Sequence, residues 1–433
     1  MGPNTLTFIL QLLISWKVLP EPVRRAYTPP SLPDGVKRVL LTLQEAGYEA
    51  YVVGGAPRDW LLGRPVNDYD VATSAKPEEV KEVFSRVIPV GLDHGTVTVV
   101  FANTAIEVTA FRRGGNALSP AGRESDGYSD TIEEDLAARD FTINAIAWQM
   151  SDEKSGAGFL VDPYGGIEDI GEGQLRGVVN AAHRFREDPL RVLRACRQAA
   201  TLDMQVEAQT LEEMANFADD CALCAVERIM VELSKLLEAA NPTIGLELLE
   251  KVGLLKKFFP KTAPFEICLK AKRALPNRLA ALLFVNDVKT VEKSLKKLKF
   301  SKAVATLVLS LVNHSQITPS TIERAADVRR FVSHVGEDVV AELLDLMAAR
   351  ELSDVETLSS AVASERASGC PFTVADLAIG GSEVMKALGS RGGPRVGAIL
   401  KELLDRVLEE PRLNERNELL ELLSSMTTTT EKC

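Results

Sequence analysis

The chain has few of the residues that build disulfide frameworks or histidine-based catalytic sites. Its 433 residues include six cysteines, scattered between Cys196 and Cys433, and four histidines that lie far apart. Such cysteine spacing does not suggest a disulfide scaffold and fits a reducing compartment better. Cys221 and Cys224 form one close pair, but no second pair is present to complete a zinc site. A histidine general base is therefore not expected.

A long hydrophobic run and an excess of basic residues are also missing. The apolar stretch Leu6–Leu19 is too short to span a bilayer, and neither a preceding basic residue nor a small-residue cleavage site accompanies it. We therefore interpret residues 1–32 as an extension outside the fold and expect a cytoplasmic protein that does not bind membranes. Because the formal net charge is −11, a polyanionic partner would have to be held by local basic patches.

The most informative stretch follows a β-type segment, Tyr51–Val53. The segment breaks at Gly54 and Gly55, where the backbone can approach a ligand closely and its amide groups can face a phosphate. Arg58 follows, at the start of a short helix that we predict over Asp59–Leu62. This order of elements predicts a site for a phosphorylated ligand.

Three acidic residues predict a metal site next to this bend. Asp68 and Asp70 are predicted to open the next strand, whose alternation places both carboxylates on one face. Glu107 lies on the polar face of the second strand of a predicted hairpin, 94–101 and 105–111. Adjacent carboxylates repel unless a cation lies between them, and Mg²⁺ is commonly held by one or two carboxylates plus substrate phosphates. If the two strands are neighbours, the three acids converge on one metal site.

A second group of candidates lies in the segment 183–200. Pro189 fits the first turn of a helix, and Asp188 lies at the positive end of that helix. Three arginines follow at spacings of three residues and form a curving basic ribbon: Arg191, Arg194 and Arg197. An aspartate beside an arginine can copy the hydrogen-bonding edge of a base. The alternative is a surface ion pair, worth well under about 1 kcal/mol.

Several motifs in order resemble the family of tRNA nucleotidyltransferases and bacterial poly(A) polymerases. The matching stretches are 53–73, 107–112, 133–145, 162–166, 184–195 and the neck-helix segment 226–237. The resemblance implies template-independent transfer of nucleotides from CTP and ATP to an RNA 3′ end, with two Mg²⁺ ions as cofactors. Its partners would be the tRNA 3′ end and the two nucleotides, and the sequence does not decide between a monomer and a homodimer.

The resemblance also implies roles for single residues. Asp68, Asp70 and Glu107 would be catalytic, with Asp68 and Asp70 as metal ligands. Residues on the nucleotide would be Gly55 and Arg58 at the triphosphate; Arg139, Asp140 and Asn144 at the ribose; Asp188 and Arg191 at the base; and Arg194 and Arg197 nearby. Gln198 and Asp203 stand where the family more often has Phe and Gly, and we interpret both changes as packing variation.

The segment 113–130 does not settle which nucleotides are added to the RNA. Its glycine, serine, proline and aspartate residues predict a mobile surface loop, and the resemblance implies the loop that helps switch from C to A addition. The loop is not obviously shortened, but the usual Tyr-x-Asp-x-Arg-x-Pro pattern is missing. CCA addition therefore competes with CC-only, A-only or poly(A) addition, and also with an inactive RNA-binding homologue, against which the intact acids argue.

Periodicity and the resemblance together predict an α+β protein. Residues 33–165 would form a nucleotidyltransferase head with a small mixed sheet and helices on one side. Residues 166–240 would form a helical neck that carries the templating helix, followed by an RNA-binding helical body, 241–330, and tail, 331–433. The lysine-rich segment 256–302 is where we expect the phosphates of the tRNA body to bind.

Overall fold

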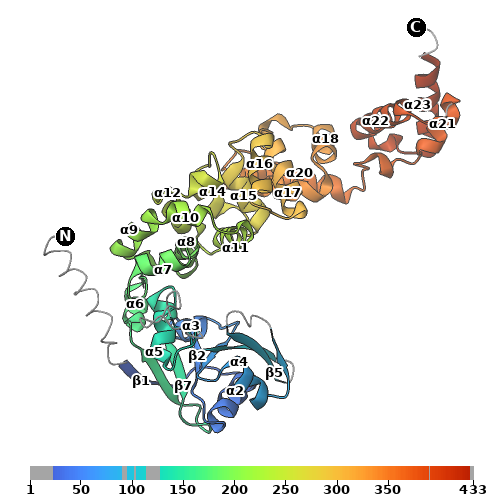
Figure 1. Cartoon of the computed structure of the whole chain (residues 1–433). Helices are drawn as coiled ribbons and strands as arrows, with labels where there is room; N and C mark the ends of the chain where they lie inside the picture. Colours follow the sequence, from blue (N-terminus) through green and yellow to red (C-terminus); the bar gives the residue numbers. More distant parts are fainter. Residues whose placement is uncertain (1–22, 90–94, 102–103, 114–126, 390, 430–433) are drawn as a thin grey trace. The chain divides into compact units, whose positions relative to one another are not determined.

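The architecture was obtained from a computed structural model (Figure 1). It describes residues 23–89, 95–101, 104–113, 127–389 and 391–429. The chain divides into two compact units: Met1–Glu232 with Leu248–Leu254, and Leu233–Glu247 with Leu255–Cys433. The first unit contains the whole sheet and the predicted nucleotide site, and the second is helical.

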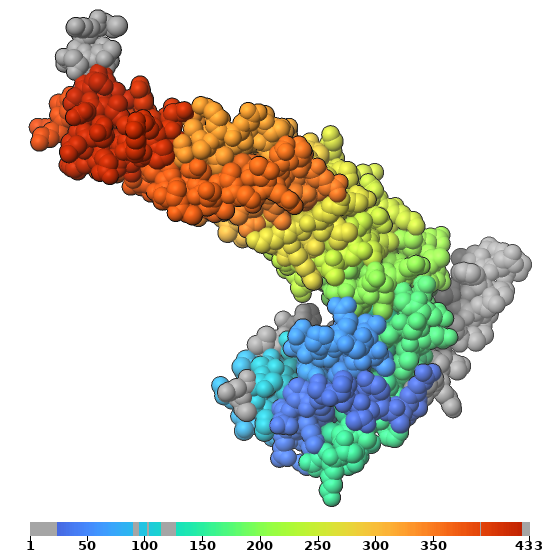
Figure 2. Space-filling model, turned by 180° about the vertical axis from the view of Figure 1, so that it is seen from behind, coloured from blue at the N-terminus to red at the C-terminus, as the bar shows by residue number. Residues whose placement is uncertain are grey.

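An eight-stranded mixed sheet forms the N-terminal head. Its strand order is β1-β8-β7-β2-β3-β6-β5-β4, and the pairing of β3 with β6 is parallel whereas the other pairings in this sheet are antiparallel. Seen from behind, the surface of the head is made by the blue to green part of the chain (Figure 2). The strands are β1 (Val23–Tyr27), β2 (Ala50–Val53), β3 (Asp70–Thr73), β4 (Val87–Ile88), β5 (Thr96–Phe101), β6 (Thr104–Ala110), β7 (Ala147–Met150) and β8 (Gly158–Asp162).

Strand β1 corrects the prediction that residues 1–32 lie outside the fold. It pairs antiparallel with β8, from Val23 opposite Asp162 to Tyr27 opposite Gly158. The Trp148 indole Nε1 also donates a hydrogen bond of 3.0 Å to the Tyr27 carbonyl oxygen. The prediction was wrong here because β1 contains two adjacent arginines, which hide any apolar alternation but are tolerated on an edge strand. Residues 1–22 lie outside the described part of the chain.

Helices cover both faces of the sheet, not one. On one face, α2 (Asp34–Glu45), α3 (Gly55–Leu61) and α4 (Pro77–Val83) pack against Val52, Val71 and Val108 (Figure 1). On the other face, α5 (Ile132–Ala137) packs against a separate core. This core contains Tyr51, Val53, Ala72, Phe111, Ile132 and Leu136. Helix α5 has only six residues and follows an aperiodic loop, so the hydrophobic period could not reveal this second layer.

Several predicted elements are confirmed. The β5–β6 hairpin forms as predicted, with Thr98 opposite Glu107. Helix α2 buries an apolar stripe at the spacing typical of an amphipathic helix, made of Val36, Val39, Leu40 and Leu43. The sequence pattern also predicts a helix over 77–87, but α4 ends at Val83, and Val87 belongs to β4, which pairs with β5.

Two helices occupy the neck segment 183–200, where the sequence predicted one helix with Pro189 in its first turn. Helix α7 (Ala181–Glu187) ends before Asp188, and α8 (Arg191–Leu202) begins after Leu190. The break follows from Pro189, because the residue before a proline avoids the helical region, and Asp188 has φ −144° and ψ 96°. Around them lie η2 (Thr142–Asn144), α6 (Gly166–Glu172), β9 (Gln174–Leu175), β10 (Gln205–Val206), α9 (Ala208–Asn216) and α10 (Ala218–Ala222).

The predicted neck helix is confirmed as α11 (Val226–Leu237), with Ile229, Leu233 and Leu236 buried. Beyond Asn241 the described chain is helical and contains no strand, as expected. None of the described helices is both long and apolar enough to cross a membrane. The longer helices are α12 (Pro242–Lys251), α15 (Leu275–Leu283), α16 (Val288–Lys297), α17 (Lys302–His314), α18 (Ala325–Val335), α19 (Glu337–Ala349), α20 (Val355–Ala367), α22 (Pro394–Glu409) and α23 (Arg416–Thr429). Shorter helices are α13 (Leu255–Phe258), α14 (Phe265–Lys270) and α21 (Gly381–Leu388).

Candidate active site

The parallel pairing of β3 with β6 brings two of the three predicted acids side by side. Asp70 lies directly opposite Glu107 in the register, so the strand adjacency inferred from the sequence is confirmed. Asp70 shares its strand face with Ala72, which packs under α5. The site thus lies on the α5 side of the sheet, away from α2 and α4.

Asp68 does not open β3 as predicted, because the strand begins at Asp70. Instead, Asp68 precedes the strand, and its Oδ1 accepts a hydrogen bond of 3.0 Å from the Tyr69 amide. Strand alternation therefore does not orient Asp68. Its charge nevertheless acts on Asp70, because it helps to raise the pKa of that carboxyl group.

The pKa of Asp70 is raised above that of an ordinary aspartate. Partial burial is the largest cause, the charges of Asp68 and Glu107 add to it, and Arg139 and Arg112 oppose it. Keeping all three carboxylates ionised therefore costs free energy, which a cation bound between them would relieve.

The donor set fits a cation that is completed by substrate. No three His, Cys, Asp or Glu side chains in the described residues are gathered closely enough to hold a metal ion by themselves. Asp68 and Glu107 are exposed, whereas Asp70 is half-buried. Mg²⁺ usually takes one or two carboxylates and fills its remaining positions with water and phosphate oxygens, so this set suits it.

The glycine bend lies against this acidic cluster. Gly54 has φ +76°, and a Cβ added there would lie 2.9 Å from Asp70 Oδ2 and 3.4 Å from Arg139 Nη1. A side chain at this position would therefore be strained and would also press on the acid. The backbone of the bend therefore lies directly beside the Asp70 carboxylate.

Helix α3 begins at Gly55, not at Asp59 as predicted. The helix can include Pro57 because proline is well tolerated in a first helical turn. Arg58 is consequently fixed within the helix. Its Nε donates to Asp59 Oδ1 at 2.9 Å, and its Nη1 donates to Asn144 Oδ1 at 2.6 Å.

Asp140 and Asn144 form a buried hydrogen-bonded group with Arg194. Asn144 Nδ2 donates to Asp140 Oδ1 at 2.9 Å, and Arg194 donates to Asp140 Oδ2 from Nε at 3.0 Å and from Nη2 at 2.7 Å. Burial alone would raise the pKa of Asp140, but Arg194 and the hydrogen bonds from Asn144 and Arg194 lower it to about 2. The Asp140 carboxylate is therefore ionised throughout the physiological range.

Gln198 belongs to this group and was not identified from the sequence. Its Oε1 accepts from Asn144 Nδ2 at 3.0 Å, and its Nε2 lies 3.4 Å from Asp140 Oδ2. It is 2% exposed, so the interpretation as packing variation was wrong. The available signal was its spacing, because Gln198 lies seven residues after Arg191 and four after Arg194, on the face of α8 that carries these predicted nucleotide residues.

The buried acid Asp135 holds Arg139 in place beside Asp70. Its Nε and Nη2 donate to Asp135 Oδ2 at 3.2 and 2.9 Å, and the Arg112 amide donates to Asp135 Oδ1 at 3.1 Å. Asp135 is fully buried, and although burial alone would raise its pKa, these two arginines lower it. Arg139 thus stands fixed between α5 and the metal candidates.

The predicted base-reading residues are each held by a different partner. Arg228 donates to both Asp188 oxygens, from Nη1 at 3.2 Å and from Nη2 at 2.6 Å. Arg191 donates from Nη1 to Glu187 Oε2 and from Nη2 to the Ala138 carbonyl, both at 3.1 Å. The two side chains are therefore oriented before any nucleotide binds.

Arg197 points to a buried acid on α11. Its Nε donates to Glu232 Oε2 at 2.5 Å, and Arg194 Nη1 lies 3.7 Å from Glu232 Oε1. Glu232 is 6% exposed. Together with Arg228, it ties the arginines of α8 to the neck helix.

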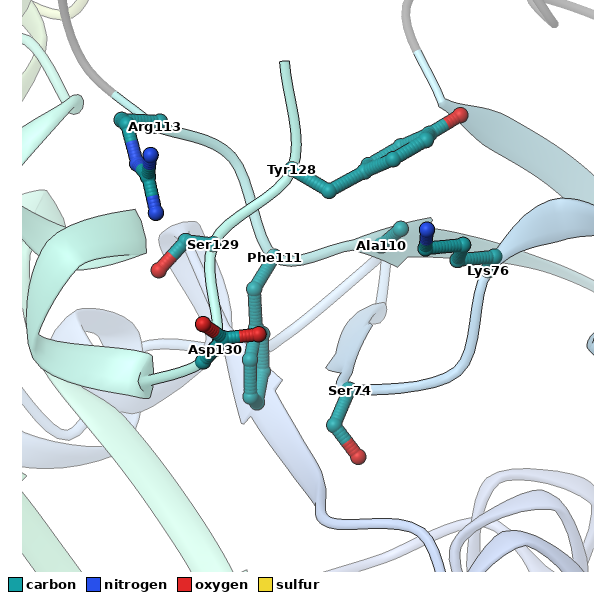
Figure 3. Close-up of a pocket in the computed structure, with 8 residues that line it drawn as sticks. All are labelled: Ser74, Lys76, Ala110, Phe111, Arg113, Tyr128, Ser129 and Asp130. Atoms are coloured by element: carbon teal, nitrogen blue, oxygen red, sulfur yellow. The ribbon is translucent and has the colours of Figure 1, made fainter. Parts of the chain in front are cut away.

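A separate hollow of about 130 Å³ lies near the carboxyl ends of β3 and β6 (Figure 3). None of the predicted site residues lines it. Arg113 and Tyr128–Asp130 come from the predicted loop 113–130, whose residues 114–126 lie outside the described chain. The lining residues are Ser74, Lys76, Ala110, Phe111, Arg113, Tyr128, Ser129 and Asp130.

Three family models match successive parts of the chain. Residues 50–176 match the poly A polymerase head domain, residues 203–266 match the RNA- and SrmB-binding site of polymerase A, and residues 277–423 match tRNA nucleotidyltransferase domain 2. The head match contains the acids, the glycine bend and the Asp140–Asn144 group.

Relatives match over most of their length. The CCA-adding enzyme of Streptococcus sanguinis is 35% identical over 390 residues, which are 86% of this chain and 92% of the relative. That of Lactiplantibacillus plantarum is 32% identical over 407 residues, 90% of this chain and 95% of the relative.

Solved structures share the fold. The Bacillus stearothermophilus CCA-adding enzyme in complex with CTP has a TM-score of 0.77 at 31% identity, covering 92% of this chain and 98% of the other. The Thermotoga maritima CCA-adding enzyme complexed with tRNA has a TM-score of 0.66 at 20% identity, covering 93% of this chain and 99% of the other, a likeness of fold alone.

Proposed function

Because the chain belongs to the family of CCA-adding enzymes, we propose that it is a template-independent tRNA nucleotidyltransferase that adds C, C and A to the tRNA 3′ end from CTP and ATP. The observation that carries this proposal is the register of Asp70 with Glu107 beside the glycine bend at Gly54. This arrangement places the acidic cluster and the backbone bend that would face the phosphates on the same face of the sheet.

Nucleotidyltransferases of this fold generally depend on a divalent cation, and we propose Mg²⁺, with Asp68 and Asp70 as its protein ligands and Glu107 beside them. Bound there, two such ions would activate the RNA 3′-hydroxyl and neutralise charge on the leaving pyrophosphate. Without the ion, the three carboxylates repel one another, and this repulsion adds to partial burial in raising the pKa of Asp70.

The triphosphate is held by the backbone amide at Gly55 and by Arg58. The Arg58 side chain is 15% exposed and is fixed by Asp59 and Asn144. A fixed guanidinium donates to phosphate oxygens with little loss of conformational entropy. Arg139, Asp140 and Asn144 form the wall against which the ribose lies, and the buried contacts of Asp140 keep this wall rigid.

The base is chosen by Asp188 and Arg191. Cytosine and adenine both carry an exocyclic amino group, which donates to a carboxylate, whereas uracil and guanine carry a carbonyl oxygen at the corresponding position. Arg228 and Glu187 hold the two side chains in place, and Arg194 and Arg197 line the nucleotide from the same helix.

The helical parts of the chain bind the tRNA body, and the head and neck, 33–165 and 166–240, carry the chemistry. Charge supports the assignment of the body, 241–330, and the match of residues 277–423 to tRNA nucleotidyltransferase domain 2 supports that of the tail, 331–433. Exposed lysines gather on and after α16, at Lys289, Lys293, Lys296, Lys297 and Lys299. They would neutralise phosphates in spite of the net charge of −11. Since its substrate is tRNA, we place the protein in the cytoplasm.

The alternatives are CC-only, A-only or poly(A) addition on the same fold. One assay separates them: purified protein is given tRNA lacking its end, tRNA ending in C and tRNA ending in CC, each with labelled CTP and ATP. We expect all three to reach CCA and then stop. Products that stop after two cytidines would indicate a CC-adding enzyme, and a failure to incorporate CTP would contradict the proposal.

Removal of divalent cations is expected to lower the melting temperature of the wild-type protein but not that of Asp70→Asn. Mg²⁺ would relieve the repulsion among the acids and stabilise the folded state by binding it, whereas asparagine already removes one charge. The metal-free variant should therefore melt above the metal-free wild type. The measurement is thermal unfolding in Mg²⁺ and in chelator; an equal gain from Mg²⁺ in both proteins would contradict metal binding at Asp70.

A further inference from the structure

Asp140, Asn144 and Gln198 close a buried triangle of hydrogen bonds that joins the head to α8. Asn144 donates to both of the others, and Gln198 Nε2 approaches Asp140. All three are almost fully buried, with exposures of 7%, 7% and 2%. None of them can exchange its partners for water without opening the site.

Both hydrogens of the Asn144 amide are used inside this triangle. One goes to Asp140 Oδ1 and the other to Gln198 Oε1, at 2.9 and 3.0 Å. The amide therefore has one orientation, which leaves its oxygen facing Arg58 Nη1 at 2.6 Å. An amide turned by 180° would present its nitrogen to the guanidinium, donor against donor.

The Asp140 carboxylate has no acceptor left for a further role. Oδ1 accepts from Asn144 and from the Phe141 amide. Oδ2 accepts from two nitrogens of Arg194 and faces Gln198. Since a carboxylate offers about four lone-pair positions, Asp140 is a support for its neighbours in this arrangement.

We propose that Gln198 is a positioning residue for the triphosphate, because it fixes the Asn144 amide in the orientation that holds Arg58. This inference rests on the function proposed above, in which Arg58 grasps the triphosphate of either nucleotide. It predicts an effect on the affinity for CTP and ATP alike. Base selection, which belongs to Asp188 and Arg191, is left unchanged.

The test is Gln198→Met, a side chain of similar length that cannot form either hydrogen bond. Without Gln198, one buried N–H of Asn144 has no partner and the amide can turn away from Arg58. We expect Kd for CTP and for ATP, measured by calorimetry with Mg²⁺ and without tRNA, to rise about tenfold, or about 1.4 kcal/mol. KM should rise in parallel, kcat should change less than about threefold, and discrimination against UTP and GTP should stay the same.

In a second variant, Gln198→Glu, the loss of nucleotide affinity should be reversible with pH. A protonated glutamate copies glutamine, since it accepts from Asn144 and donates to Asp140, whereas the ionised form faces the Asp140 carboxylate. The other charged groups near the triangle are Arg194, Arg191, Arg58 and Glu232. Kd relative to wild type at the same pH should therefore be worst at pH 8 and recover towards pH 6.

The matched control is Cys196→Ala, which removes a fully buried side chain from the same helix without touching the triangle. It should lower the melting temperature and leave both Kd values within about twofold. A Gln198→Met protein with unchanged Kd, or a Cys196→Ala protein with an equal rise, would overturn the inference while wild-type CCA addition stood. A wild-type protein that binds neither nucleotide would overturn the proposed function and the inference together.

Discussion

Replacing Asp70 by asparagine is expected to lower the rate of nucleotide addition at least about a thousandfold. The substitution keeps the size of the side chain but removes the charge at the centre of the acidic cluster, next to Glu107. Metal-assisted charge stabilisation contributes several kcal/mol to phosphoryl transfer, and each 1.36 kcal/mol corresponds to about a factor of ten in rate. Single-turnover addition of CMP to tRNA that lacks its end measures this rate directly.

Asp34→Asn is the control for Asp70→Asn. The substitution is chemically the same and lies in the same domain. Asp34, however, is exposed at the start of α2, on the face of the sheet opposite to the acids. Its rate should stay within about twofold, since surface substitutions usually have small effects. An Asp70→Asn protein that extended tRNA at nearly the wild-type rate would remove this residue from the metal site.

Exchanging Asp188 for alanine is expected to reduce discrimination for CTP over UTP, and for ATP over GTP, by about ten- to a hundredfold. A carboxylate accepts from the amino group of cytosine or adenine and repels the carbonyl oxygen of uracil or guanine, and one such base contact is worth about 1–3 kcal/mol. The substitution also releases Arg228. Competition assays with pairs of nucleotides, read by the sequence of the added end, measure the ratio.

Glu212→Ala serves as the control for Asp188→Ala, because Glu212 is an exposed acid on α9 of the neck. It should leave nucleotide choice unchanged. If Asp188→Ala slowed all four nucleotides equally and kept the wild-type ratios, base reading by Asp188 would be wrong, and the residue would serve only to anchor Arg228.

The sequence predicted the elements whose pattern is local. Helix α2 and the β5–β6 hairpin follow from hydrophobic periods, and α11 follows from its apolar stripe together with the family resemblance. Strand β1 could not be predicted in this way, because an edge strand is specified by its partner β8 and not by alternation of its own residues. The break between α7 and α8 was predictable in principle, since Pro189 restricts Asp188.

The sequence predicted the residues that carry the chemistry of the site, but not the buried side chains that hold them in place. The acids, the glycine bend and Arg58 carry their chemistry in residue type and order, and the structure brings Asp70, Glu107 and Gly54 together. The Asp140–Asn144–Gln198 triangle depends on side chains 54 and 58 residues apart. No local period encodes such a contact, so only the fold could reveal why a glutamine is buried in α8.

The position of the bound cation tests the metal site most directly, and Mn²⁺ reports that position. A crystal of the protein with Mn²⁺ and CTP, measured at the manganese absorption edge, should show anomalous density bound by Asp68 and Asp70 and by phosphate oxygens of the nucleotide, within reach of Arg58. Manganese bound elsewhere, with Asp68 and Asp70 free of metal while CTP occupied the site, would contradict the account.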